Sequence, residues 1–347
     1  MTPTARNLPR FPYRVAIEPR LNVPGWLPAA VSLGAVAAAL LLGALVLALV
    51  GGDPWAAYAH IARAAFGELG VFSDTLVKAT PLILTGLACA VAFRMKLWNI
   101  GAEGQFFAGA LGASALVLSG VVNEAWPQWL VLPVLVAAGM LCGALWSLLP
   151  GLLRAYLRVN EIITTGDIVG VDTDTWLPRL ADFAREVPAF RGLTTHLGLL
   201  LAVLAALAVW YILYRSLWGY EIRLIGDNDR AAEYAGLDIR RNLVLVLMLS
   251  GALAGLAGMS EITGVVHRLQ TNISPGYGFS GINVAWLAKL NPLLVIPVAI
   301  LFGGLILAGR EIQPAGVPRL IQGIILFMLI ASEVLLRYRV RIDKAAA

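Results

Sequence analysis

Three kinds of residue are scarce in this chain of 347 residues, and each scarcity excludes a class of protein. Charged side chains make up only 14% of the chain and hydrophobic ones 59%, which excludes an ordinary water-soluble domain. The two cysteines, Cys89 and Cys142, lie singly inside apolar runs, so neither a disulfide framework nor a zinc site is indicated. The histidines are few and scattered, and the GxxxxGK(S/T), HExxH and GxSxG motifs are missing. The sequence therefore predicts neither an intrinsic ATPase nor a hydrolase, and no metal site.

Long apolar runs fill most of the chain and predict an all-α, polytopic membrane protein. At about 20 residues per crossing, the hydrophobic content suffices for about ten membrane elements. The first run, 26–50, is longer than the core of a signal peptide and follows four arginines, so we expect an uncleaved first helix. The other long runs are 74–93, 104–122, 128–152, 193–214, 242–265, 292–308 and 319–336.

Two further stretches lack the features of an ordinary membrane-spanning helix. The run 279–290 is too short to cross a membrane alone, which favours a half-helix or re-entrant segment. The stretch 161–176 carries three aspartates, each costing a few kcal/mol at a helix centre. Arginine-rich loops lie on either side of 161–214, and the positive-inside rule predicts that both are cytoplasmic. A chain that leaves the cytoplasm and returns to it must cross the membrane an even number of times. We therefore expect a marginal fifth span at 161–176.

This topology places both termini in the cytoplasm and makes the chain one membrane domain. The expected parts are a cytoplasmic segment 1–25, a transmembrane domain 26–336 with a cytoplasmic loop 215–241, and a cytoplasmic tail 337–347. The net charge of +5 comes from basic residues at the ends of apolar runs rather than on one soluble face. Nucleic-acid binding is therefore not expected, whereas membrane lipid is the expected surrounding.

The first polar motif within apolar sequence is WNIGAEGQ, residues 98–105. Its glycines permit an unwound backbone, and the amides of Asn99 and Gln105 can hydrogen-bond an uncharged polar solute. We predict that Trp98, Asn99, Glu103 and Gln105 line a solute pathway. The alternative is a tight cytoplasmic turn in which Glu103 stabilises the start of the next helix.

The second motif is NISPGYGFSGIN, residues 272–283, which leads into the short apolar element. Aromatic faces beside amide and hydroxyl groups suit a flat heterocycle or a sugar. A pair of glycine- and proline-interrupted elements in the two halves of a chain is the best sequence pointer to a central transport pathway. We predict that Tyr277, Phe279, Ser280 and Asn283 contribute to it; the alternative is a loop on the outer side that dips back into the protein.

The third motif is the charged loop GYEIRLIGDNDRAAEYAGLDIRRN, residues 219–242. Asn228 or Asp229 can cap a short helix over 230–234 that ends at Gly236. A short amphipathic helix at the membrane surface is a plausible docking element for a soluble partner, and the alternative is a solvated connector. Two charged residues within apolar helices, Lys78 and Glu261, are either pathway residues or paired with neighbours.

At these motifs the sequence resembles the permease subunits of ABC importers in the ribose and branched-chain amino acid permease superfamily, specifically the nucleoside and simple-sugar branch. The resemblance covers nearly the whole chain. It is carried by KLWNIGAEGQFFAGALGA (96–113), LRVNEIITT (157–165), GYEIRLIGDNDRAAEYAG (219–236) and SPGYGFSGINVAWLAKLNPL (274–293). It departs after LRVNEIITT, where this chain reads GDIVGVDTDTW in place of the family's long apolar helix.

The resemblance implies a bundle of about ten membrane segments, a non-enzymatic transport role and several partners. These partners are a cytoplasmic ABC ATPase, which carries the ATP and Mg, a second related permease, and an extracytoplasmic substrate-binding lipoprotein; no cofactor is expected on this chain. The expected location is the bacterial inner membrane. The coupling helix that would contact the ATPase corresponds to Gly226, Asp229, Arg230, Ala231, Ala232, Glu233 and Gly236.

The motif NIGAEGQ favours nucleosides over sugars as the solute, on its likeness to the nucleoside branch. Two other functions remain as alternatives. An ion-gradient-driven secondary transporter would use Glu261, although this residue is expected near the outer end of its helix. A membrane scaffold without a transport role would leave solute flux unchanged on deletion.

Overall fold

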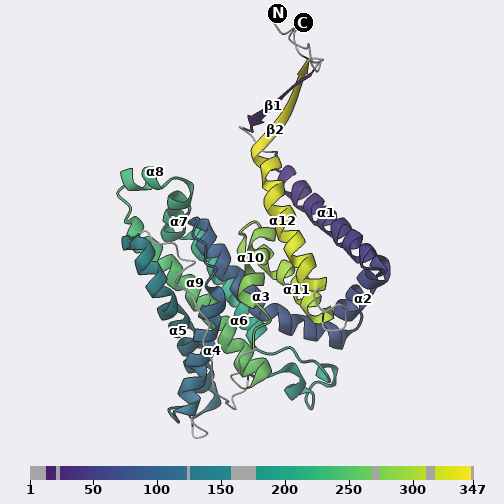
Figure 1. The fold of residues 1–347 in the computed structure, drawn as a ribbon. Coiled ribbons are helices and arrows are strands. Elements are labelled where there is room, and N and C mark those ends of the chain that lie inside the picture. Colours follow the sequence, from purple (N-terminus) through teal and green to yellow (C-terminus); the bar gives the residue numbers. More distant parts are fainter. Residues whose placement is uncertain are drawn as a thin grey trace, which may run out of the picture.

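The computed structural model describes residues 13–20, 24–122, 126–157, 177–267, 273–309 and 317–344. Helices make up most of these residues (Figure 1), so the expected all-α class is confirmed. Five of the helices are long and apolar enough to cross a membrane. They contain 30–49, 69–94, 129–152, 198–215 and 239–266; three shorter apolar helices cover 102–118, 292–308 and 320–336.

Every long apolar run predicted from the sequence coincides with a helix. The run 26–50 is α1 (Leu27–Leu49), and 74–93 lies within α3 (Leu69–Arg94). The short element is α10 (Tyr277–Leu287), as expected for a segment too short to span. The remaining runs are α4 (Ala102–Leu118), α5 (Gln128–Leu157), α6 (Gly198–Arg215), α9 (Ile239–Glu261), α11 (Pro292–Ala308) and α12 (Val317–Arg337). The predicted span at 161–176 lies outside the described residues, so the total of ten stays a prediction.

Helix α3 forms the centre of the molecule and packs against α9, α10, α11 and α6. From Val77 to Phe93 every residue of α3 is buried. A helix that is apolar on all sides and surrounded by other helices has no face left for lipid or water. Polar side chains on α3, such as Thr85 and Lys78, must therefore find partners inside the protein.

Helices α4, α5 and α9 pack closely through glycines. A Cβ atom added to Gly109 on α4 would lie 2.2 Å from the Cα of Gly255 on α9. One added to Gly143 on α5 would lie 2.2 Å from the carbonyl oxygen of Gly251. Small residues of this kind let helix backbones approach each other, which is a main source of helix association in lipid.

Helices α1 and α12 run side by side and are joined to the centre through α2 (Pro54–Phe66) and α10 (Figure 1). Beyond them, β1 (Tyr13–Pro19) pairs with β2 (Tyr338–Lys344) in an antiparallel ribbon. Tyr13 lies opposite Lys344, and Pro19 opposite Tyr338. The sequence interpretation treated these two segments as separate tails and did not foresee their pairing.

Two connecting regions lie at opposite ends of α3. At the Arg94 end, α7 (Leu217–Asp227) and α8 (Asp229–Tyr234) form the charged loop, labelled at the upper left of Figure 1. At the Leu69 end lies the loop 177–197, which contains the short 3₁₀ helices η2 (Leu180–Phe183) and η3 (Pro188–Phe190). This loop is held to α3 by two hydrogen bonds between Ser73 and Thr195, one of which the Thr195 N–H donates to the Ser73 hydroxyl oxygen.

Candidate functional site

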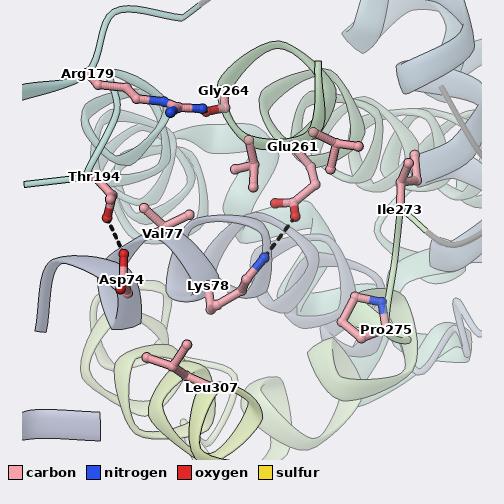
Figure 2. Close-up of a pocket in the computed structure, with 12 residues that line it drawn as sticks. Asp74, Val77, Lys78, Arg179, Thr194, Glu261, Gly264, Ile273, Pro275 and Leu307 are labelled. Carbon is pink, nitrogen blue, oxygen red and sulfur yellow. Dashed lines mark hydrogen bonds and ion pairs between the residues drawn. The ribbon is translucent and has the colours of Figure 1, made fainter. Parts of the chain in front are cut away.

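A polar cavity of about 460 Å³ lies between α3, α11, the end of α9 and the loop 177–197 (Figure 2). It is on the side of the molecule away from α8. One part of its wall is charged and the other is apolar. The lining residues are Asp74, Val77, Lys78, Arg179, Thr194, Glu261, Gly264, Val265, Val266, Ile273, Pro275 and Leu307.

The central feature of the cavity is an ion pair between two buried residues from different helices. The Lys78 Nζ atom on α3 lies 3.2 Å from a carboxylate oxygen of Glu261 on α9. The Tyr277 hydroxyl donates to the same oxygen at 3.4 Å, and its ring lies 5.9 Å from Lys78 Nζ. A buried charge without a partner would cost several kcal/mol, so each residue makes the other tolerable in an apolar bundle.

The loop side of the cavity is tied down by Arg179. Its guanidinium donates to the carbonyl oxygen of Gly264 at 3.0 and 3.2 Å and to His267 Nε2 at 2.6 Å. Gly264 belongs to a π-helical turn, η4 (Ile262–Val266), that ends at His267 with a positive φ of 58°. A π-helical turn frees carbonyl groups from the regular α-helical pattern and often marks a functional site.

A second contact closes the loop against α3. The Thr194 hydroxyl donates to the Asp74 carboxylate at 2.5 Å. Both residues line the cavity, as Figure 2 shows. Two of the four charged residues in the wall, Arg179 and Asp74, are thus each bound to a fixed partner, whereas Lys78 and Glu261 face each other.

His196 lies buried behind this wall, between the start of α6 and the π-helical turn. Its Nδ1 atom accepts a hydrogen bond from the Gly198 N–H at 3.1 Å. Burial lowers the pKa of His196 to about 4, and the nearby positive charge of Arg179 adds to this effect. The imidazole is therefore neutral at physiological pH.

The amides of the WNIGAEGQ motif form a closed network elsewhere. Asn99 Nδ2 donates to Gln105 Oε1 at 2.7 Å and to the Ser250 hydroxyl oxygen at 2.6 Å. Gln105 Nε2 donates back to Asn99 Oδ1 at 3.0 Å. Ser250 in turn donates to the carbonyl of Ala88 at 2.6 Å. These buried side chains bind one another and join α3, α4 and α9.

The two predicted pathway motifs meet at Glu103. Its carboxylate accepts a hydrogen bond from the backbone N–H of Gly278 at 2.6 Å. Gly278 is required there because a Cβ atom would lie 2.3 Å from the Glu103 nitrogen. The next residue back, Tyr277, is fully buried, and its carbonyl accepts from the Thr85 hydroxyl at 3.0 Å.

The other predicted pathway residues lie apart from the cavity. Trp98 is part of an aromatic cluster, with ring centres 5.2 Å from Phe93 and 6.1 Å from Trp286. Ser280 is buried, with its hydroxyl 3.3 Å from Gln322 Oε1. The last two are Asn283, which is buried, and Phe279, which is exposed.

Of the predicted pathway residues, Tyr277 contacts the ion pair, although it is not in the cavity wall itself. Sequence reasoning missed Asp74, Arg179 and Thr194. It had singled out Lys78 and Glu261 as charges in apolar helices, and that signal leads to the cavity. Whether Trp98, Asn99, Glu103, Gln105, Phe279, Ser280 and Asn283 line a pathway stays a prediction.

The short helix in the charged loop has the predicted form. Helix α8 is capped by Asn228, whose side chain accepts from the Ala231 N–H at 3.1 Å. The chain turns at Gly236 with a positive φ of 77°. Ala232 is buried, whereas Arg230, Ala231, Glu233 and the 96% exposed Tyr234 face outward or lie at the surface.

The loop is joined to α3 through Gly226 on α7. A Cβ atom there would lie 1.8 Å from the carbonyl oxygen of Arg94, the last residue of α3. Lys96 also donates to the Asp227 carbonyl at 3.3 Å. A space of about 250 Å³ remains between this end of α3, α7 and α9, and it is lined in part by Asp229.

The family model described as branched-chain amino acid transport system, permease component, matches residues 71–332, well over half of the chain. The chain belongs to this permease family. The matched region of the permease begins within α3 and ends within α12, so it contains both the cavity and the charged loop. No solved structure matches the chain.

Curated relatives extend over most of the permease. The glucose ABC transporter permease protein TsgB13 of Haloferax volcanii is 33% identical over 94% of this chain and 93% of its own length. The guanosine ABC transporter permease protein NupP of Bacillus subtilis is 32% identical over 89% of this chain and 94% of its own length. A second guanosine permease protein of that bacterium, NupQ, is 26% identical over 66% of this chain and 78% of its own length.

Proposed function

We propose that this chain is the membrane-embedded permease subunit of an ABC importer for nucleosides or simple sugars. The observation that carries the proposal is the cavity with the Lys78–Glu261 pair, which offers polar groups beside an apolar wall inside a helical bundle. Solutes of both classes have hydroxyl groups on a ring with apolar faces. The names of the similar proteins TsgB13 and NupP, which refer to glucose and guanosine, support the same two classes.

The proposed assembly has a cytoplasmic ABC ATPase, which binds ATP and Mg, against α7 and α8. The loop supports this arrangement because α8 is short, capped and exposed, and includes Arg230 and Glu233. A second related permease and an extracytoplasmic substrate-binding lipoprotein complete the importer. The existence of both NupP and NupQ in Bacillus subtilis is consistent with a pair of permeases. The chain would sit in the bacterial inner membrane with both termini in the cytoplasm.

The proposed mechanism uses α3 as a rigid connection between the loop and the cavity. Gly226 contacts the last residue of α3, and Lys78 lies 16 residues earlier in the same helix, about 24 Å away at 1.5 Å per residue. A displacement of α7 and α8 by the ATPase would therefore move α3 and the part of the cavity wall that α3 supplies. Such a movement alternates access to the cavity between the two sides of the membrane.

ATP-dependent uptake in proteoliposomes tests this function. Vesicles would contain this chain with and without candidate ATPase, second permease and binding protein, and labelled guanosine, ribose and glucose would be supplied. Uptake that requires ATP and the partners is the expected result. Uptake by this chain alone, abolished by an ionophore and indifferent to the ATPase, would contradict it and support the alternative of an ion-driven transporter that uses Glu261.

The coupling role of α8 is tested by Arg230→Glu. We expect ATP hydrolysis to continue while solute uptake falls at least tenfold, because a reversed charge disturbs a surface that transmits motion but not the ATPase site itself. The matched control is Arg185→Glu, an equally exposed arginine in the loop 177–197. Normal uptake by the Arg230 variant would exclude α8 from coupling.

A further inference from the structure

The cavity wall contains both charged and apolar side chains, as Figure 2 shows. The charged side chains come from α3, the end of α9 and the loop 177–197. The apolar part of the wall consists of Val77, Val265, Val266, Ile273, Pro275 and Leu307. The volume of about 460 Å³ lies within the range of about 300–1,000 Å³ that is usual for small-molecule sites.

The charges in the wall balance one another. Asp74 and Glu261 carry two negative charges, and Lys78 and Arg179 carry two positive ones. A charged solute would upset this balance beside the buried Lys78–Glu261 pair, whereas a neutral solute with several polar groups would not. The composition of the wall therefore favours an uncharged, hydroxylated molecule.

We propose that the cavity is a hydroxyl-recognition site, in which Lys78 and Glu261 together bind two adjacent hydroxyl groups on a sugar ring. The inference rests on the proposed function and identifies the part of the solute that the permease itself contacts. One hydroxyl oxygen accepts a hydrogen bond from the Lys78 ammonium. The neighbouring hydroxyl donates to the Glu261 carboxylate, and the apolar part of the wall packs against the ring.

The geometry of the ion pair fits this role. The Lys78 Nζ atom and the Glu261 carboxylate oxygen lie 3.2 Å apart. At this spacing Lys78 can bind one of two neighbouring hydroxyl oxygens of a sugar while Glu261 binds the other. The Lys78 ammonium has three N–H donors, and its bond to Glu261 uses one of them; a carboxylate can accept several hydrogen bonds at once. Charge-assisted hydrogen bonds to a neutral hydroxyl are stronger than neutral ones.

The pair can accept a solute at little cost. The attraction between two buried charges is largely offset by the loss of their hydration, so the net stability of the pair is small. Hydroxyl groups entering the cavity would replace part of this attraction, while the Tyr277 hydroxyl stays within reach of Glu261. Arg179 and Asp74, which are bound to Gly264 and Thr194, would keep the wall in place.

The test compares solutes with and without the adjacent hydroxyls in the complete importer. From guanosine, ribose and glucose, the solute with the fastest ATP-dependent uptake is chosen, together with its analogue that lacks two neighbouring hydroxyls. Both are supplied at concentrations that saturate the binding protein, so that its preference does not enter the ratio of the two rates. The variant is Lys78→Met combined with Glu261→Gln, which leaves no unpaired charge, and the matched control is Glu68→Gln on the exposed residue before α3.

The measured quantity is the uptake rate of the hydroxylated solute divided by that of its deoxygenated analogue. We expect this ratio to be the same in the wild type and the control, and at least tenfold lower in the double variant. An unchanged ratio in a double variant that still transports would overturn the inference and leave the proposed function intact. The absence of ATP-dependent uptake in the wild type would overturn both. If the double variant fails to assemble, Lys78→Arg takes its place, because it keeps the charge but moves the donor. It should change the ratio at least threefold. An unchanged ratio in this variant would refute the site.

Discussion

Two buried polar clusters in this permease differ in their charge and in what lies beside them. Asn99, Gln105 and Ser250 are neutral and bind one another on a path that ends at the Ala88 carbonyl. Lys78 and Glu261 are charged and border an open cavity. Both clusters are interruptions of apolar sequence. Under the proposed function, the space beside a polar group, rather than its polarity, distinguishes a group that only holds helices together from one that also binds a solute.

The largest expected effect comes from breaking the charged cluster on one side only. Glu261→Gln leaves the Lys78 ammonium buried without its counter-charge, and we expect the unfolding free energy to fall by about 3–5 kcal/mol. Thermal unfolding of the purified chain in detergent measures this change, with Glu68→Gln as the control. Adding Lys78→Met should restore most of the loss, and a single variant as stable as the wild type would show that the pair is not buried as described.

A smaller effect is expected in the neutral cluster. Asn99→Leu removes both hydrogen bonds of the Gln105 amide, and leaving such buried groups unsatisfied costs about 2–3 kcal/mol. The same thermal unfolding experiment measures it. We expect the preference for hydroxylated solutes to remain, because the network does not line the cavity. If Asn99→Leu changed the preference for hydroxylated solutes without lowering the stability, the solute would be bound at Asn99 rather than at the Lys78–Glu261 pair.

The smallest effect concerns His196, whose pKa is lowered to about 4 from 6.5. The unfolded chain then binds a proton more readily than the folded one, so stability is full above pH 6.5 and falls as the pH drops toward 4. Between pH 7.5 and 5.5 the loss is roughly 1.5 kcal/mol. Unfolding temperatures at the two pH values, compared between wild type and His196→Asn, measure it. Asparagine can accept the Gly198 N–H without titrating, so equal pH dependence in both proteins would contradict the assignment.

Much of the fold could be predicted because apolar runs of membrane length leave few alternatives. Every long run is a helix, and the element 279–290 is the short α10. The predicted cap at Asn228 is also present, since capping depends on local sequence. Helix α2 was missed because its 13 residues, with His60 and Arg63, are neither long nor uniformly apolar. The ribbon between β1 and β2 was missed because nothing local specifies a partner so distant in sequence.

The candidate site was less predictable for the same reason. Lys78 and Glu261 were each noted as charges in apolar helices, but their pairing across 183 positions depends on how α3 packs against α9. Arg179 and Thr194 lie in a polar loop, where such residues are ordinary and give no signal. Asn99 and Gln105 were predicted to line a solute pathway, which stays a prediction; that their two amides bind each other is not visible in the sequence.

The ribbon joining β1 to β2 has a consequence for the order of biogenesis. Helix α1 is synthesised well before its principal neighbour, α12. While the ribosome makes everything between, α1 must wait in the lipid without that neighbour. Pairings so remote along the chain form slowly, because they close a long loop. A chain arrested before α12 should therefore contain a docked α3–α9 centre and an α1 that is held chiefly through its contact with α2.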